Sequence, residues 1–242
     1  MKEGKTRRRA ASLIGVLGGV LITAAAIALY IPGLGLFGLR EIAVTGNRRV
    51  SAEAIARAAD LRAGQPLMAI SLAHVSSNVS SIPWILSATA HRDFPHGLSI
   101  RVRERRPVAW VRSPEDGTCY TVGEGGRIVV EGCESEDALL ELVGAPFIDY
   151  VPGTGVGDRG VSGLVDALAD PALSILNIRR IDVTDPSSVE LVTESGLRVL
   201  MGSVDTHAQC VAKLAALSRE VELSAYRQID LRLEGEATLV TW

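Results

Sequence analysis

The sequence predicts an α+β protein with a single N-terminal transmembrane helix, a small β-α-α-β-β domain and a mainly antiparallel β domain with one or two helices. Three observations predict this order. Residues 10–31 carry no charge, residues 98–105 alternate apolar with polar side chains, and short strands separated by turns follow Pro107. The expected boundaries are a basic tail over 1–11, the transmembrane helix over 12–32, the small domain with a short linker over 33–106, and the β domain over 107–242.

The uncharged run follows directly on three arginines, Arg7 to Arg9. As a helix the run would rise about 33 Å, and the hydrocarbon core of a bilayer is about 30 Å thick. Much of the run is Ala and Gly, so its apolarity is adequate rather than strong. The apolar residues expected to form the span include Leu13, Val16, Val20, Ile22, Ile27 and Leu29.

The charges on either side of the run predict its orientation. The tail holds five basic residues against Glu3 alone, whereas the formal charge of the whole chain is −3. The positive-inside bias therefore keeps the N-terminus in the cytoplasm and everything after Ile31 outside. A cleaved signal peptide is the competing interpretation because Ala24-Ala25-Ala26 offers a cleavage site, but apolar residues continue beyond it. The pair Arg8-Arg9 is a loose match to a twin-arginine signal.

Two helices are expected in the small domain, after a strand over 39–44. Ser51 predicts the start of a helix that runs from Ala52 to about Leu61. A second helix begins behind Ser71 and ends at Pro83, because proline cannot continue the hydrogen-bond ladder. Its apolar residues recur at helical spacing: Leu72, Val75, Val79 and Ile82.

Two strands complete the small domain, over 85–92 and 98–106. In the second strand Leu98, Ile100 and Val102 share one face, and the arginines at 101, 103 and 105 share the other. The sheet is therefore expected to be covered by the helices on one side and wet on the other.

Four motifs stand in this region in a fixed order. They are Val44-Thr45-Gly46-Asn47, then Gly64-Gln65-Pro66-Leu67, then Phe94-Pro95, then a run that ends in Glu104-Arg105-Arg106-Pro107-Val108-Ala109. Together they resemble the POTRA domain of the FtsQ/DivIB family of bacterial division proteins, and the last motif is the most specific.

The remainder of the chain predicts mostly strands. They are expected over 108–112, 119–122, 127–130, 178–183, 189–193, 197–201, 228–233 and 237–242, with helices over 160–170 and 205–223. Residues 138–150 are ambiguous. The order is similar to the second domain of the same family, so the resemblance covers essentially the whole chain. One departure is Gly123 in the first hairpin, where relatives often carry Asp.

Cys119 and Cys133 flank the predicted hairpin over 119–130 and could close a disulfide outside the cytoplasm. Symmetric folding about Glu124-Gly125 would place Cys119 nearer to Val130 than to Cys133. The disulfide would therefore need a bulge or a longer excursion, and the residues leave it open. Cys210 falls in a helical apolar stripe, which is typical of a buried thiol.

No arrangement of residues in the sequence indicates chemistry. The four histidines are far apart, no cysteine pair has zinc-ligand spacing, and no G-x-S-x-G motif is present. We therefore expect no catalytic residue, no metal site and no cofactor. The basic face at Arg101, Arg103 and Arg105 lacks interleaved aromatics, which favours a solvated face or an acidic partner over nucleic acid.

The resemblance implies a non-catalytic scaffold of the division complex in the cell membrane at the septum. It implies that the β domain binds the division proteins FtsB and FtsL through its last strand, while the POTRA domain contacts other components of the complex. The partner-binding residues carried over are Leu233, Gly235, Ala237, Leu239 and Trp242. The register of this segment is open by one residue, and Trp242 fits either partner binding or the core.

A membrane-anchored extracytoplasmic cell-wall enzyme is the alternative, with the POTRA-like part as a positioning module. It would require a pocket with converging carboxylates or a Ser/His pair.

Overall fold

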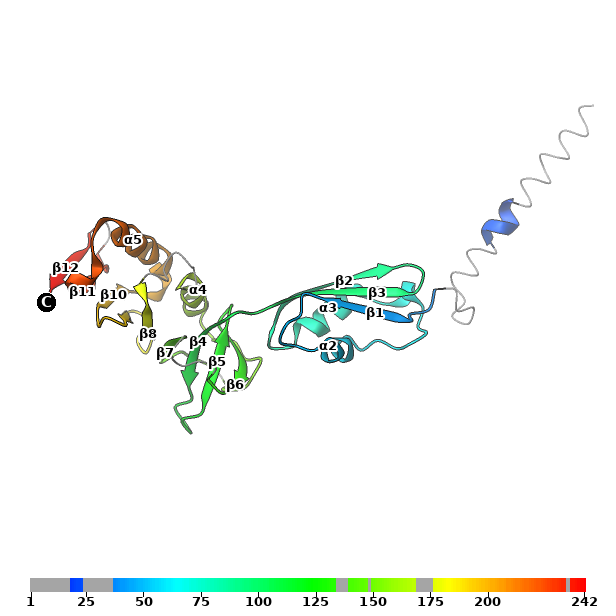
Figure 1. Cartoon of the computed structure of the whole chain (residues 1–242), viewed down its shortest axis with the longest axis horizontal. Helices are drawn as coiled ribbons and strands as arrows, with labels where there is room; N and C mark the ends of the chain where they lie inside the picture. The colour runs from blue at the N-terminus through cyan, green and yellow to red at the C-terminus, as the bar shows by residue number, and fades with distance from the viewer. Residues whose placement is uncertain (1–17, 24–36, 134–138, 148, 169–175, 234–235) are drawn as a thin grey trace, which may run out of the picture. The chain divides into compact units, whose positions relative to one another are not determined.

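The computed structural model describes residues 18–23, 37–133, 139–147, 149–168, 176–233 and 236–242. The chain divides into two compact units. The N-terminal unit contains the residues up to Ser80 together with 87–103, and the C-terminal unit contains 81–86 and 104–242. A three-stranded sheet in the order β1-β3-β2 belongs to the first part of the chain, and a nine-stranded sheet in the order β12-β11-β10-β9-β8-β7-β4-β5-β6 to the second (Figure 1).

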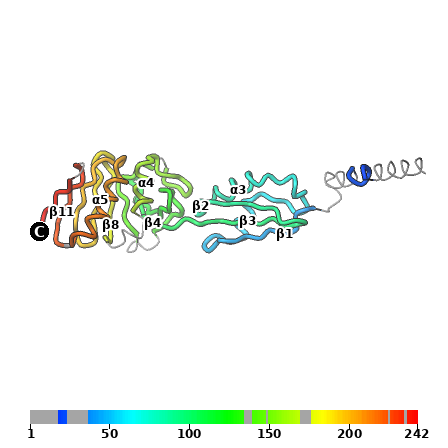
Figure 2. Tube along the Cα trace, turned by 90° about the horizontal axis from the view of Figure 1, so that it is seen from above, coloured from blue at the N-terminus to red at the C-terminus, as the bar shows by residue number. Residues whose placement is uncertain are grey.

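The N-terminal unit has the β-α-α-β-β order that the sequence predicts. Its elements are β1 (Glu41–Thr45), α2 (Ala52–Ala58), the 3-10 turn η1 (Leu67–Ala69), α3 (Leu72–Ser80), β2 (Ile85–Asp93) and β3 (Gly97–Glu104). Figure 2 shows the three strands side by side. β1 pairs with β3 in parallel, with Val44 opposite Ile100.

Alternation along β3 separates the two faces of this sheet. Leu98, Ile100 and Val102 are buried, whereas Arg101 and Arg103 are exposed. The helices bury Ile55, Val75 and Val79. Because the apolar side chains of strand and helices are the buried ones, the core lies between the helices and the sheet, and the arginines lie on the wet face.

Nine strands and two helices make up the C-terminal sheet and its cover. The strands are β4 (Pro107–Arg112), β5 (Cys119–Gly123), β6 (Arg127–Glu131), β7 (Leu140–Val143), β8 (Ile178–Asp182), β9 (Val189–Thr193), β10 (Arg198–Gly202), β11 (Tyr226–Asp230) and β12 (Thr238–Thr241). The helices are α4 (Arg159–Leu168) and α5 (His207–Glu220), with 3-10 turns η3 (Val204–Thr206) and η4 (Leu223–Ala225). Three pairs are parallel, β4 with β7, β7 with β8 and β10 with β11, and the other pairs are antiparallel.

The two faces of the C-terminal sheet differ in chemistry. On one face α4 and α5 pack against apolar strand residues, and one buried cluster contains Leu164 and Leu214 of the helices together with Ile181, Leu191 and Ile229 of the strands. On the open face charged side chains pair across neighbouring strands: Glu141 with Arg180, and Glu190 with Arg198. The sheet is therefore dry on the helix side and solvated on the other.

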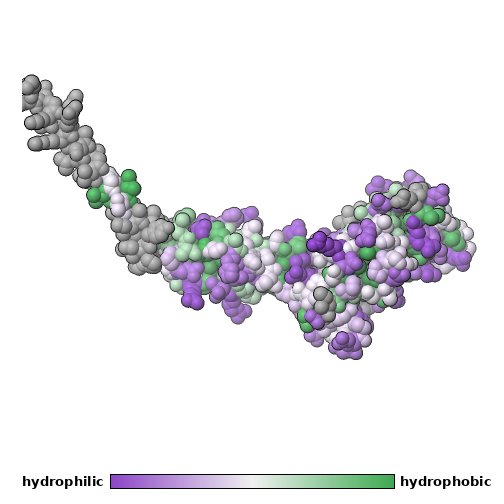
Figure 3. Space-filling view, turned by 180° about the vertical axis from the view of Figure 1, so that it is seen from behind, coloured by the Kyte–Doolittle hydropathy of each residue, from purple (hydrophilic) through white to green (hydrophobic). Residues whose placement is uncertain are grey.

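The predicted transmembrane helix is the part of the fold class that the structure corrects. Among the described residues, no helix is both long and apolar enough to cross a bilayer. Of the expected span only residues 18–23 are described, as a short helical segment that carries hydrophobic side chains (Figure 3). Its Val20 and Ile22 are exposed. The other expected span residues, Leu13, Val16, Ile27 and Leu29, lie outside the described residues.

Gly46 supports a tight turn after β1, and its replacement tests the packing of this unit. Its φ is +88°, and a Cβ atom there would overlap the carbonyl oxygen of Val102. Gly46→Ala is expected to lower the free energy of unfolding by about 2 kcal/mol or more, measured by urea denaturation, because strain and overlap add. Gly64→Ala is the matched control, since φ is +79° there but no atom lies within 4 Å of the added methyl group. Equal losses in the two variants would contradict a role for the contact with Val102.

Candidate partner-binding edge

β12 forms one edge of the nine-stranded sheet. It runs antiparallel to β11, with Ile229 opposite Leu239 and Gln228 opposite Val240. Because side chains alternate along a strand, Leu239 lies on the helix-covered face beside the buried Ile229, and Val240 lies on the open face. No described strand pairs with the other side of β12, which therefore offers its outer backbone groups to a partner.

The opposite edge of this sheet is covered by the chain itself. The amide of Ile128 in β6 donates to the carbonyl of Thr154 (2.9 Å), and the amide of Gly153 donates to the carbonyl of Ile128 (2.8 Å). Two residues before Ile128, the carbonyl of Gly126 accepts a hydrogen bond from the amide of Val156 (2.8 Å). The loop over 153–156 thus occupies the outer backbone groups at the start of β6, and covering an edge with a loop is a common way to protect it.

Side-chain contacts hold the segment that leaves β11. The amide and the guanidinium of Arg232 donate to the carboxylate of Asp230, and these hydrogen bonds hold the pKa of Asp230 below its usual range. The Nζ atom of Lys213 in α5 donates to the carbonyl of Leu233 (2.9 Å). The chain therefore leaves β11 on a defined course before it returns as β12.

The residues that the resemblance implies for partner binding occupy different environments. Leu233 is 61% exposed, Ala237 is exposed just before β12, and Trp242 is 70% exposed. Leu239 is half-buried against the core, and Gly235 lies outside the described residues. The ring of Trp242 lies beside the β9–β10 turn, since a methyl group added at Gly196 would be 3.6 Å from it. The edge therefore combines Leu239, which packs towards the core, with two large exposed apolar side chains, Leu233 and Trp242.

Sequence reasoning missed two features of this edge. The first feature is Val240, whose apolar side chain lies on the open face of β12. The residues that the resemblance implies stand at every second position, on one face of a strand only: Leu233, Gly235, Ala237 and Leu239. Strand alternation through Trp242 would have indicated Val240. The bond from Lys213 to the carbonyl of Leu233 had no local signal, because it joins residues 20 apart.

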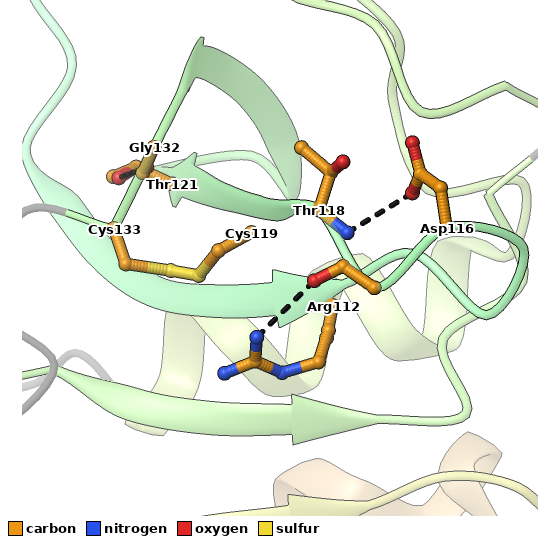
Figure 4. Close-up of a disulfide and its surroundings, with 8 residues drawn as sticks. Arg112, Asp116, Thr118, Cys119, Thr121, Gly132 and Cys133 are labelled. Atoms are coloured by element: carbon orange, nitrogen blue, oxygen red, sulfur yellow. Dashed lines mark hydrogen bonds between the residues drawn. A yellow bond between two sulfur atoms is a disulfide. The ribbon is translucent and has the colours of Figure 1, made fainter.

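Cys119 and Cys133 form a disulfide at the open end of the β5–β6 hairpin, with their Cα atoms 5.6 Å apart (Figure 4). Thr121 opposes Val130, but Val122 opposes Ile128, so β6 carries one extra residue at this point. This β-bulge shifts the register from the symmetric one and brings Cys133 to Cys119. The carbonyl of Cys119 accepts a hydrogen bond from the amide of Gly132 (2.7 Å), which closes the hairpin beside the disulfide.

The C-terminal unit contains a cavity of about 860 Å³, and an active site would require catalytic groups that converge on such a cavity. Its lining includes Asp116, Glu141 and Arg180. Glu141 lies 3.8 Å from Arg180, and Asp116 accepts a hydrogen bond from the amide of Thr118 (3.0 Å). Hydrogen bonds from Thr118 hold the pKa of Asp116 below its usual range, so Asp116 is unsuited to act as a general acid. Within the described parts of the chain, no cluster of three or more His, Cys, Asp or Glu residues could hold a metal ion.

The Glu190–Arg198 pair on the open face gives a pH-dependent prediction. The guanidinium of Arg198 donates to Glu190 (2.6 and 2.9 Å), and these hydrogen bonds lower the pKa of Glu190. The stabilisation is therefore present above the unfolded pKa of Glu190 and lost as pH falls through the lowered folded pKa. Arg198→Gln is expected to cost at most about 1 kcal/mol at pH 7, measured by urea denaturation, because the pair is largely solvated.

Arg227→Gln, at an exposed site on β11, is the control for this prediction. In acid, where Glu190 is protonated, the difference between Arg198→Gln and the unchanged chain should disappear. A loss of stability that persists in acid would show that the ion pair is not its cause.

Comparisons with known proteins agree with this architecture. The family model described as "POTRA domain, FtsQ-type" matches residues 37–105. A cell division protein FtsQ from Geobacter sp. (strain M21) is 39% identical over 204 residues, which cover 81% of this chain and 73% of that protein. The FtsQ of Mycobacterium leprae is 28% identical over 84% of this chain and 60% of its own length. The chain spans about 60 to 65% of the mycobacterial relatives.

Among solved structures, the extracytoplasmic domain of the cell division protein DivIB from Geobacillus stearothermophilus aligns with 49% of this chain and 98% of its own. The sequence identity is 20% and the TM-score is 0.31.

The β-α-α-β-β unit, which the family model matches, defines a POTRA-containing protein. The FtsQ from Geobacter narrows this class to one family, because it matches over most of both chains. This chain belongs to the FtsQ/DivIB family of bacterial cell division proteins.

Proposed function

We propose that this chain is a non-catalytic scaffold of the division complex that binds the division proteins FtsB and FtsL through the outer side of β12. The observation that carries the proposal is the difference between the two edges of the nine-stranded sheet, since a loop bonds to the start of β6 and no described strand pairs with the outer side of β12. An extended segment can add to an open edge through main-chain hydrogen bonds. In this role Leu239 anchors β12 to the core, and Leu233, Ala237 and Trp242 contact the partner, as the resemblance also implies for Gly235.

The proposed location is the division septum, with the tail before residue 12 in the cytoplasm and both units outside it. The Cys119–Cys133 disulfide supports this arrangement, because disulfides persist in oxidising compartments and are rare in the cytosol. The proposed division of labour assigns other components of the division complex to the POTRA domain over 33–106 and the FtsB/FtsL pair to the β domain over 107–242.

The cell-wall enzyme alternative has less support. The carboxylates of Asp116 and Glu141 in the large cavity are engaged by Thr118 and Arg180, and the relatives carry the name of a division protein rather than that of an enzyme.

A binding assay tests the proposal. The full chain and a chain that ends at Leu233 are each mixed with the extracytoplasmic segments of FtsB and FtsL, and circular dichroism checks that both chains are folded. We expect the full chain to bind and the shortened chain to lose binding. Glu131→Ala, at an exposed site on the opposite edge, is the control and should bind as the full chain does. Equal binding by the shortened, folded chain would contradict the role of β12, and no binding by the full chain would contradict the choice of partner.

A further inference from the structure

A second surface lies in the N-terminal unit, where two aromatic rings are in contact and an exposed methionine follows a residue bonded to one of them. The amide of Leu67 donates to the carbonyl of Phe37 (2.9 Å). Met68 is the residue after Leu67 and is therefore close to the backbone of Phe37. The rings of Phe37 and Phe94 meet edge to face, with centroids 6.0 Å apart. We call Phe37, Met68 and Phe94 the apolar tip.

The fold holds the apolar tip in place from both sides. The guanidinium of Arg92 in β2 donates to the carbonyls of Leu67 (2.8 Å) and Ile70 (2.6 Å), which ties η1 to the sheet. On the other side the amide of Arg40 donates to the carbonyl of His96 (2.8 Å), which ties the β2–β3 turn to the start of β1. The tip is therefore part of the folded unit rather than a free loop.

Exposure sets the tip apart from the other large apolar residues of this unit. Met68 is 60% exposed and Phe94 is 57% exposed, whereas the neighbouring Leu67 and Leu98 are fully buried. Two large apolar side chains exposed at one end of a small domain are typical of an interaction surface.

The charge of the unit indicates the kind of surface that the tip meets. The N-terminal unit, counted from Phe37, holds eight arginines against four acidic residues, for a formal charge of +4. The C-terminal unit holds 12 basic against 23 acidic residues, for a formal charge of −11. At the tip itself Arg40 and Arg62 are exposed, with Glu41 and Asp93 exposed nearby. An anionic surface would thus attract the N-terminal unit and repel the C-terminal one.

Apolar side chains flanked by arginines suit the interface of a bilayer with anionic lipids, where the apolar groups enter the headgroup region and the cations meet phosphates. The sequence places another apolar segment close to the tip, because the uncharged run over 10–31 ends six residues before Phe37. An acidic protein would account for the arginines but not for exposed Phe and Met side chains beside such a run.

We propose that the apolar tip inserts into the headgroup region of an anionic phospholipid bilayer, with Arg40 and Arg62 at the phosphates. Met68 and Phe94 then enter the bilayer by about 5 to 10 Å, the depth usual for interfacial side chains. The contact fixes how the N-terminal unit is oriented on the membrane. It does not depend on partner binding at β12.

Spin labels in the full chain test this proposal. Single cysteines replace Met68, Phe94 or, as the control, Thr89, which is exposed on β2 of the same sheet. A nitroxide label reacts only with the introduced cysteine, because Cys210 is buried and Cys119 and Cys133 are bonded to each other. The labelled chains are reconstituted in vesicles of phosphatidylglycerol and phosphatidylethanolamine. Power-saturation EPR then compares collisions with oxygen, which concentrates in lipid, and with a nickel chelate, which stays in water.

We expect the oxygen-to-nickel collision ratio at Met68→Cys and Phe94→Cys to exceed that at Thr89→Cys several-fold. Adding Phe94→Ser to the chain labelled at position 68 should lower the ratio there towards that at Thr89→Cys, and circular dichroism checks that this variant is folded. Ratios at 68 and 94 equal to that at 89 would overturn the proposal. Low collision rates with both reagents would also overturn it, since they would show that protein covers the tip.

Discussion

Replacing both Cys119 and Cys133 by serine is expected to lower the free energy of unfolding of the C-terminal unit by about 3 kcal/mol. The disulfide joins residues 14 apart and closes the β5–β6 hairpin. Its loss increases the freedom of the unfolded chain, while the folded hairpin keeps its backbone hydrogen bonds, such as that from Gly132 to Cys119. Urea denaturation followed by circular dichroism measures the change.

A reductant supplies the control for the disulfide prediction. It should lower the stability of the unchanged chain to the level of the double-serine variant and leave the variant unaffected. If the unchanged chain were equally stable with and without reductant, the disulfide would contribute nothing to stability, and it would no longer support an extracytoplasmic location.

Leu239→Pro and Val240→Pro are expected to have different effects, and one of them should reduce binding to the FtsB and FtsL segments by about 100-fold or more. Neighbouring residues of an edge strand point their amides in opposite directions, one to the paired strand and the next outward. Proline removes the amide, and a loss of about 3 kcal/mol corresponds to about 100-fold in affinity. The variant that removes the outward amide should weaken binding, and the variant that removes the inward amide should lower the free energy of unfolding.

Isothermal titration and urea denaturation of both variants separate the two effects. Val130→Ala in β6, at the edge opposite β12, is the control and should bind as the unchanged chain does. The edge model would be wrong if both proline variants remained folded and bound the partner with unchanged affinity.

The small domain could be predicted in detail because its signals are local. The alternation of Leu98, Ile100 and Val102 with arginines predicts β3, and Ser51 predicts the start of α2, where its side chain accepts a hydrogen bond from the amide of Ala54. In the C-terminal unit the expected helix over 205–223 is observed as η3, α5 and η4 in succession. Local patterns of this kind depend on neighbouring residues alone.

Strand pairing could not be predicted in the same way. Alternation shows that a segment is a strand, but not which strand lies beside it, so the parallel placement of β7 between β4 and β8 had no local signal. Pairing across the sheet also determines which edges remain open. The resemblance directed attention to the last strand, whereas the covering of the start of β6 by the loop over 153–156 becomes visible only in the fold.

The bulge in β6 is a similar case. Symmetric folding of the hairpin about Glu124-Gly125 separates the two cysteines, and one extra residue between the partners of Thr121 and Val122 brings them together. A bulge of one residue leaves no clear trace in the alternation of so short a strand.

Amide hydrogen exchange of the full chain, with and without the FtsB and FtsL segments, tests the use of β12 most directly. In the free chain the inward amides of Thr238 to Thr241 are bonded to β11 and the outward ones face solvent. We expect the outward amides, at every second residue, to become protected in the complex, while those of β6 do not change. Tight binding that leaves the outward amides of β12 exchanging at their free rate would contradict this use of β12.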